Sequence, residues 1–364
     1  MFLKMEKSVY KPGLLIATVF LLLSTVLNAQ EEVSKEYHKD YTVKKDQGLE
    51  LNNRYGDIVV ETSNTDRVKI DIKVTVRYPN RERAERLLSY INVQFDEDDD
   101  LISAKTEIDN RFNFSGWQGD SRKFTIDYNV EMPENMDLNV ANKYGDTDLD
   151  DLSGLVSIDI RYGDLTASAL TRGNEKPLNS IHLSYGKAEI DEAGWLDATL
   201  RYSNNFILSR CQAMLLDSRY STLHLGDVSS IVGDTKYDKL NIRSINNLVL
   251  NTGYADVNVQ TLEKKLMLDG GYGSLTIDRI PEGFDSLDVR AKYMGIRMGI
   301  DRSAGYNLDA KVSYGSLKFN DDNFQNRRRI IENNSSQISG TVGDNQEVTS
   351  VVKISSSYGS VKLY

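Results

Sequence analysis

The sequence predicts an all-β protein: a β-solenoid, or β-helix, of roughly 10–11 stacked turns preceded by a small α+β cap. The first observation is a repeat. A tyrosine with alternating apolar residues on both sides recurs from Tyr144 to Tyr358, at steps of 18, 23, 17, 18, 17, 17, 18, 21, 21 and 44 residues. A period near 18 is typical of units that bury their apolar faces only by stacking on one another.

The second observation is a change of apolar phase at each tyrosine. Leu266 and Leu268 share one strand face with Tyr272, whereas Leu275 and Ile277 after it are one position out of step. Such a change needs an extra residue at a corner. Seven of the twelve tyrosines in this setting, Tyr55 included, are followed by glycine. Because glycine accepts a positive φ without a Cβ clash, we expect the corner at the glycine.

The spacing leaves no room for a crossover helix between strands, so each unit is two or three short strands joined by corners. The alternative is a sandwich or barrel with turns about every 8–12 residues. That alternative gives no reason for one corner to recur at one phase. We therefore favour the solenoid.

Residues 1–29 have the pattern of a secretory signal peptide. Lys4, Lys7 and Lys11 precede an apolar stretch from Leu14 to Leu27, and Ala29 follows. The stretch is shorter than the roughly 20 residues of a membrane span, although an uncleaved anchor is the alternative. We expect an exported protein, periplasmic or on the cell surface or secreted, with no membrane span after cleavage.

Residues 30–142 are predicted to form the cap, and residues 143–364 the repeats. Gln30–Asp40 is expected to be a loose charged leader, and Leu49–Val60 is a first copy of the repeat. Asn80 is a plausible N-cap for an amphipathic helix, with Pro79 at its start. The expected secondary structure of the cap is one helix over Arg81–Ile91 and strands over Val68–Val76, Leu101–Ile108 and Lys123–Met132.

Charge and cysteine content limit the function classes. The formal net charge is −10, and removing three lysines and one glutamate with residues 1–29 makes it −12. An acidic exported chain is a poor candidate for binding nucleic acid. Cys211 is the only cysteine, so no disulfide can form within the chain.

The signal peptide, the early copy at Leu49–Ile58 and the tandem Tyr-Gly-Asp strands resemble a family of candidate adhesins of bacterial cell envelopes. This family is similar to the head domain of auto-transporter-like adhesins and is common in Bacteroidota. The resemblance covers most of residues 40–364. It implies a β-helical fold and a non-enzymatic, extracytoplasmic role, and it supplies no site residues.

A basic stripe is the first candidate binding site. The residue before the tyrosine points outward by parity, and it is basic at Arg54, Lys143, Arg161, Arg201, Arg219, Lys236 and Lys292. One interpretation is a ladder of surface charges neutralised by nearby aspartates, such as Asp57, Asp146, Asp159, Asp164, Asp217 and Asp234. The other is a track for an anionic glycan along Arg161, Arg201, Arg219 and Lys236. We favour the charge ladder.

Aromatic residues supply the second candidate. Phe112, Phe114 and Trp117 lie in a loop rich in Gly, Ser and Asn. Exposed loop aromatics can bind a partner, and Phe114 and Trp117 are the candidates. They can equally fold down and close the end of the stack. The repeated tyrosines themselves are predicted to be architectural, with rings stacked from turn to turn.

Neither catalytic nor metal-binding residues nor a cofactor are predicted. His38 lies in the leader, and His182 and His224 fall on outward positions. Glu97–Asp100 lacks the alternate spacing of a calcium loop and is expected to be a solvated turn. The sequence therefore favours a non-enzymatic binder of an envelope glycan or surface protein. A periplasmic scaffold or envelope-stress protein and a polysaccharide-active enzyme are the alternatives, and an exposed end strand at Ser360–Tyr364 would allow self-association.

Overall fold

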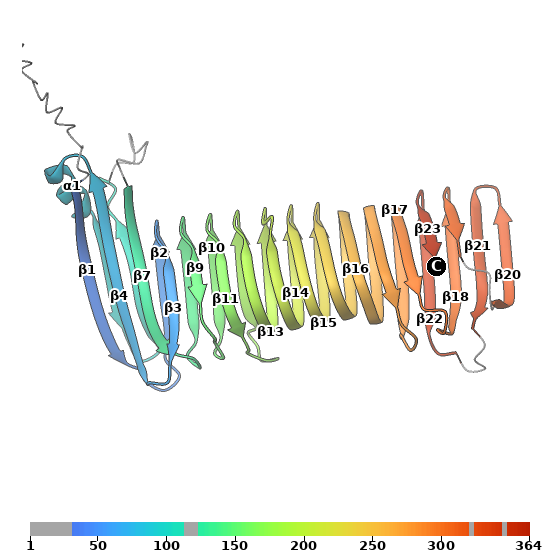
Figure 1. Cartoon of the computed structure of the whole chain (residues 1–364), viewed down its shortest axis with the longest axis horizontal. Helices are drawn as coiled ribbons and strands as arrows, with labels where there is room; N and C mark the ends of the chain where they lie inside the picture. Colours follow the sequence, from blue (N-terminus) through green and yellow to red (C-terminus); the bar gives the residue numbers. More distant parts are fainter. Residues whose placement is uncertain (1–30, 113–122, 320–323, 344–347) are drawn as a thin grey trace, which may run out of the picture.

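The structure, a computed structural model, describes residues 31–112, 123–319, 324–343 and 348–364. Within these ranges the chain forms 23 strands, β1 to β23, and one helix, α1 (Figure 1). The predicted all-β class is confirmed. No helix in the described ranges has the length and apolar character that crossing a bilayer requires.

The chain opens with long antiparallel strands, seen at the blue end of Figure 1. β1 (Glu31–Thr42) pairs along its whole length with β4 (Arg67–Tyr78), which also pairs with β7 (Lys123–Pro133). β5 (Ile91–Glu97) and β6 (Leu101–Ile108) form a second antiparallel pair. The expectation of a loose leader is therefore wrong. Val33 is buried in β1, and an unbroken ladder to β4 holds its charged residues in an ordered strand.

The predicted helix is present as α1 (Arg81–Leu88). Asn80 has an extended backbone, and its Oδ1 accepts the backbone N–H of Arg83 at 2.9 Å, as expected for an N-cap. Ala84 and Leu87 are its buried residues. The helix ends at Leu88 because Ile91 already begins β5.

The strands from β8 to β17 pair in parallel from one tyrosine repeat to the next. β8 pairs with β10, β10 with β12, β12 with β13, and each strand from β13 to β16 pairs with the one that follows. This is not the pairing of an antiparallel sandwich or barrel. The bounds are β2 Gly48–Arg54, β3 Ile58–Ser63, β8 Leu138–Lys143, β9 Thr147–Leu149, β10 Val156–Arg161, β11 Leu165–Leu170, β12 Asn179–Ser184, β13 Ala188–Arg201, β14 Phe206–Arg219, β15 Thr222–Lys236, β16 Lys239–Ile280 and β17 Ser286–Ile300.

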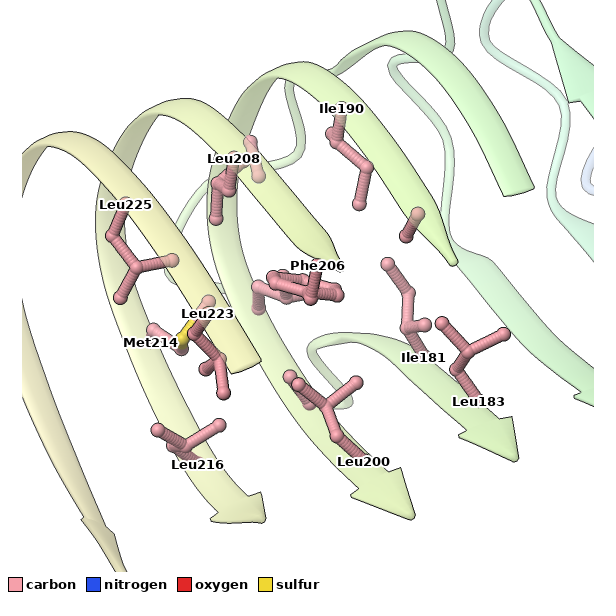
Figure 2. Close-up of a cluster of buried hydrophobic side chains, with 14 of the residues drawn as sticks. Ile181, Leu183, Ile190, Leu200, Phe206, Leu208, Met214, Leu216, Leu223 and Leu225 are labelled. Carbon is pink, nitrogen blue, oxygen red and sulfur yellow. The ribbon is translucent and has the colours of Figure 1, made fainter. Parts of the chain in front are cut away.

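The core lies between the strand segments before and after each tyrosine. Figure 2 shows Leu200 and Leu216 from the segments before the tyrosines, and Leu208 and Leu225 from those after, projecting into one interior. All four are buried. The alternating apolar residues thus form one continuous core, and the polar residues between them face outward. The first repeat, β2 and β3, already pairs in parallel with β8 and β9.

The corner itself differs from the expectation. The positive φ belongs to the tyrosine, at +54° to +66° in all twelve repeats, and among the seven glycines that follow them only Gly273 shares it. The left-handed residue turns the ring outward, so that Tyr272 is 44% exposed although Leu268 is buried. Glycine is required for another reason: a Cβ on Gly145 would lie 1.9 Å from the carbonyl oxygen of Gly56.

The C-terminal segment inserts into the stack. β22 (Val351–Ser357) pairs in parallel with both β17 and β18 (Tyr306–Ser313), and β23 (Ser360–Leu363) pairs with both β17 and β19 (Ser316–Lys318). The expectation that Ser360–Tyr364 is an exposed edge is therefore wrong.

The outermost position at this end belongs to an antiparallel hairpin instead. β20 (Phe324–Glu332) pairs with β21 (Ser335–Val342), which pairs with β18. β20 runs through a polar stretch that includes Arg327, Arg328 and Arg329. Figure 1 shows the hairpin beyond β18.

Candidate functional site

Stacking of the repeats places equivalent outward residues in rows. Because the parallel strands keep one register over many turns, residues at the same distance from each tyrosine lie beside one another at intervals of roughly 4.8 Å. Four such rows bear on function: the tyrosines, the basic residues beside them, a polar row after the tyrosines and an apolar row before them.

The tyrosine row is a continuous stack of rings. Neighbouring ring centroids are 4.6–5.2 Å apart with interplanar angles of 0–16°, and the order ends with Tyr293, Tyr358 and Tyr314 because of the inserted C-terminal strand. At the other end Tyr55 also contacts Phe124. Each interior ring has both faces covered by its neighbours, so only ring edges and hydroxyl groups are exposed. The predicted stacking is confirmed, and the interior rings leave no platform on which a sugar ring could stack, whereas Tyr314 at the end of the row stacks on a single described tyrosine.

The basic row lies next to the tyrosines, and most of its side chains form ion pairs with aspartates or lie over tyrosine rings. Arg161 Nη2 is 3.0 Å from Asp159, and Arg201 Nη2 is 2.6 Å from Asp217, which also lies 3.8 Å from Arg219. Lys236 forms no ion pair with a residue that the structure describes. The Nζ atoms of Lys143 and Lys292 lie over the rings of Tyr144 and Tyr293, at 4.8 and 5.5 Å from the ring centroids.

The aspartates that follow the tyrosines have a different task from the expected one. The Oδ1 of Asp57 accepts the backbone N–H of Asp146 at 2.9 Å, and that of Asp146 accepts the backbone N–H of Asp164 at 2.8 Å. Asp164 in turn accepts the N–H of Lys187 at 2.8 Å. These carboxylates tie one turn to the next instead of neutralising the basic row.

The aromatic candidates are placed only in part. Phe114 and Trp117 lie outside the described residues. Phe112 is buried, with its ring centroid 4.8 Å from that of Phe124. For Phe112 the structure therefore favours closure of the stack over an exposed binding role.

The histidines and the acidic turn do not form a site. His38 donates to or accepts from Asp71 at 2.6 Å in the β1–β4 ladder. His182 and His224 are exposed on opposite sides of their tyrosine corners. Asp98 Oδ1 accepts the backbone N–H groups of Asp100 and Leu101 at 2.8 Å, as in a tight turn. No three His, Cys, Asp or Glu side chains in the described ranges gather closely enough to share a metal ion.

Cys211 and Asp238 are among the buried ionisable groups with shifted pKa values. Burial raises the pKa of the Cys211 thiol to about 12, so the thiolate that reacts with oxidants and electrophiles is scarce at neutral pH. Burial also raises the pKa of the Asp238 carboxyl to about 6. Asp238 takes the place of the corner glycine after Tyr237, and it accepts the backbone N–H groups of Ser221 at 2.7 Å and Lys236 at 3.0 Å.

A hollow of about 460 Å³ lies on the outer face of the segments after the tyrosines. It is named the polar hollow for the side chains of its two rows, although the half-buried Ile207 also lines it. Four residues after successive tyrosines stand His224, Asn241, Asn258 and Thr276. Asn258 Nδ2 donates to Asn241 Oδ1 at 3.3 Å, so the row is partly linked from turn to turn. A neighbouring row adds Gly226, Arg243, Gln260 and Asp278.

An apolar hollow of about 550 Å³ lies on the outer face of the segments before the tyrosines. Five residues before successive tyrosines stand Leu215, Val232, Val249 and Met267. Sequence reasoning missed both hollows. The signal was available, since each row is a fixed offset from the tyrosine, but it emerges only when outward positions are aligned repeat by repeat.

Comparison with known proteins gives distant likenesses only. No family model and no curated protein matches the chain. Among solved structures, a candidate cell adhesion protein of Clostridium sporogenes is 11% identical with a TM-score of 0.22, over 91% of this chain and 99% of that one. A candidate adhesin of Bacteroides fragilis is 15% identical with a TM-score of 0.27, over 67% of this chain and 96% of that one. A candidate adhesin of Parabacteroides distasonis is 12% identical with a TM-score of 0.24, over 93% of this chain and 98% of that one. These values are too low to decide fold or function.

Proposed function

We propose that the chain is an exported β-solenoid that binds a linear, uncharged glycan on its outer surface, as an adhesin-like protein without catalytic activity. The polar hollow carries this proposal. It presents amide, imidazole, guanidinium and hydroxyl groups in two parallel rows, at the regular spacing of the turns. A linear glycan presents hydroxyl groups at regular intervals along its own axis.

The groups in the hollow retain hydrogen-bonding capacity. A side-chain amide has two donors and a carbonyl acceptor. The bond from Asn258 to Asn241 uses one donor of Asn258 and part of the acceptor of Asn241, and Asn241 Nδ2 also donates to the carbonyl oxygen of Leu223 at 3.5 Å. The Nε and Nη2 groups of Arg243 donate hydrogen bonds to the carboxylate of Asp227, at 3.0 and 2.6 Å, and the other N–H donors of the guanidinium remain for a ligand. The pairing with Asp227 also cancels the guanidinium charge, which favours an uncharged ligand over an anionic one.

Binding is proposed in preference to hydrolysis. Glycoside hydrolysis generally uses a pair of carboxyl groups on either side of the scissile bond. Of the described residues that line the hollow, Asp278 contributes the carboxylate. Incubation of the protein with each bound glycan, followed by an assay for new reducing ends, should give none.

The binding test is a calorimetric titration with soluble neutral polysaccharides, such as β-glucan, xylan and chitin oligomers. Replacing Asn241, Asn258 and Gln260 together by alanine should weaken binding at least about tenfold, since each hydrogen bond contributes roughly 0.5–1.5 kcal/mol. A matched control replaces three amides outside the hollow: Asn139, Gln212 and Asn247. Equal affinity of both triple variants would refute the assignment of the site.

Location is tested separately. Protease treatment of intact cells should degrade a surface-exposed protein and spare a periplasmic one. The mass of the protein from its native envelope should correspond to a chain beginning at or near Gln30, and a mass that includes residues 1–29 would instead support the anchor.

A self-assembling scaffold is the second candidate. Among the described strands, β1 and β20 lie at opposite ends and each pairs with a single neighbour, β4 and β21. Open edges of this kind permit end-to-end association. Both carry many charges, including Arg327, Arg328 and Arg329 in β20, and charged edge strands discourage pairing. Sedimentation that shows a monomer at high concentration would eliminate the scaffold.

A further inference from the structure

We propose that the apolar hollow before the tyrosines docks a basic amphipathic helix of a partner protein. The proposal goes beyond glycan binding, because it concerns a different face of the stack and a different class of partner. It rests on the arrangement of exposed apolar residues, on the carboxylates beside them and on the spacing of the row.

The exposed aliphatic residues are concentrated in this hollow. Apart from tyrosines, the large apolar side chains exposed in the described part of the chain are Leu215, Val232, Met267 and Ile331. The first three line the hollow, together with the half-buried Val249. Leu215 is paired in register with Val232, and Val232 with Val249. Clustering of this kind marks an interaction surface, whereas isolated exposed apolar residues are ordinary.

Carboxylates border the apolar row. Asp217, Asp234 and Asp269 lie two positions further along the same strand face, and Asp197 is paired in register with Leu215 at one end of the row. Asp217 already bonds Arg201. Asp197, Asp234 and Asp269 form no ion pair with any described residue. The lining also includes Arg290, which is paired in register with Asp269 and lies 3.6 Å from Asp288. With five aspartates and one arginine in its lining, the hollow offers an apolar centre with net negative charge beside it, which complements apolar and cationic groups on one partner.

The spacing favours a helix as the occupant. The row runs across the strands, with steps of roughly 4.8 Å and a length of about 14 Å from Leu215 to Met267. A helix lying along it presents one side chain per turn at 5.4 Å, close to that step, and covers the row in about three turns. An extended segment presents same-face side chains about 6.6–6.8 Å apart and falls out of step.

A second copy of this chain is the less suitable occupant. It would bring its own aspartate row into the interface, where like charges close together are unfavourable. A lysine- or arginine-bearing helix has no such conflict, because its charges match Asp197, Asp234 and Asp269.

The test uses a fluorescent synthetic helix of about 18 residues, or five turns, with leucine along one face and lysine on both flanks. Anisotropy titrations compare the wild-type protein with the double variant Val232→Ser/Met267→Ser, whose side chains point outward and whose thermal unfolding should be unchanged. We expect Kd to rise at least tenfold in this variant. Asp234→Asn/Asp269→Asn should raise Kd several-fold at low salt and less at high salt.

Two controls make the result specific. Ile331→Ser removes an exposed aliphatic side chain outside the hollow and should leave Kd unchanged. A peptide of the same composition but permuted sequence, without an apolar face, should bind at least tenfold more weakly. Equal binding of the permuted peptide, or equal Kd in Val232→Ser/Met267→Ser, would overturn the proposal. So would a wild-type dimer in sedimentation that this double variant abolishes, because the occupant would then be a second copy.

Discussion

Substitutions of Tyr220 should separate the two roles of the corner tyrosines. Tyr220 has a φ of +56°, and its ring lies 4.9 Å from those of both Tyr202 and Tyr237. A non-glycine residue in this left-handed region costs roughly 1–2 kcal/mol. Two stacked ring contacts return roughly 0.5–1.5 kcal/mol each. The stack thus compensates for the strain at the corner.

These magnitudes predict an order of stability. Tyr220→Phe keeps the ring and should change the free energy of unfolding by less than about 0.5 kcal/mol, because the hydroxyl lies at the exposed edge. Tyr220→Ala loses both ring contacts and keeps the strain, for a loss of about 1–3 kcal/mol. Tyr220→Gly loses the same contacts but relieves the strain, so it should be more stable than the alanine variant by about 1 kcal/mol.

The assay is equilibrium unfolding in urea, with slopes compared between variants to confirm that the same transition is measured. Thr166, exposed in the regular strand β11, supplies the matched control. There the free energy of unfolding of the alanine variant should exceed that of the glycine variant by about 0.5–1 kcal/mol. Tyr314 stacks on a single described tyrosine, so Tyr314→Ala should cost about half as much as Tyr220→Ala. If alanine is as stable as glycine at position 220, the left-handed corner does not carry the strain assigned to it.

Three further predictions concern other parts of the stack. Because the raised pKa of Asp238 means that the folded state binds the proton more tightly than the unfolded state, the free energy of unfolding should fall by at most about 3 kcal/mol between pH 4 and pH 7, and Asp238→Asn should remove that part of the slope. Deletion of Tyr220–Lys236, one whole repeat, should leave a cooperative thermal transition, whereas deletion of eight residues from the same place should misalign the apolar rows and abolish it; similar unfolding of the two would contradict the stacking. Glutamine at all four basic candidate positions should change stability by about 1 kcal/mol per lost ion pair or less and leave glycan binding intact, and lost binding in a folded variant would make the basic row the site. Those four positions are Arg161, Arg201, Arg219 and Lys236.

The periodic features of the fold could be predicted because they depend on local pattern. Alternating apolar residues specify which strand face is buried, and the helix over Arg81–Leu88 follows from Asn80 and the apolar spacing after it. The recurrence of the tyrosine at a nearly constant step also implied stacked rings. Each of these inferences compares residues that are close in the sequence.

The remaining features depend on contacts between distant segments. Glu31–Asp40 has little apolar content of its own, and only the partner strand β4 makes it a strand. Insertion of Val351–Ser357 between β17 and β18 leaves no trace in the local pattern, because β22 carries the same repeat as its neighbours. The sequence likewise did not reveal that the positive φ belongs to the tyrosine and not to the glycine after it. Position 145 requires glycine because the carbonyl group of Gly56, 89 positions earlier, leaves no room for a Cβ.

The outward rows show the same division between sequence and tertiary structure. The sequence by itself determined which residues face outward and repeat, including Asn241 and Asn258 on one face and Val232 and Val249 on the other. Only the stacking of turns in one register brought those residues side by side and made hollows of them. The physical reason is that a side chain contributes to a binding surface through its neighbours, and in a stack of parallel strands those neighbours lie a whole turn away along the chain.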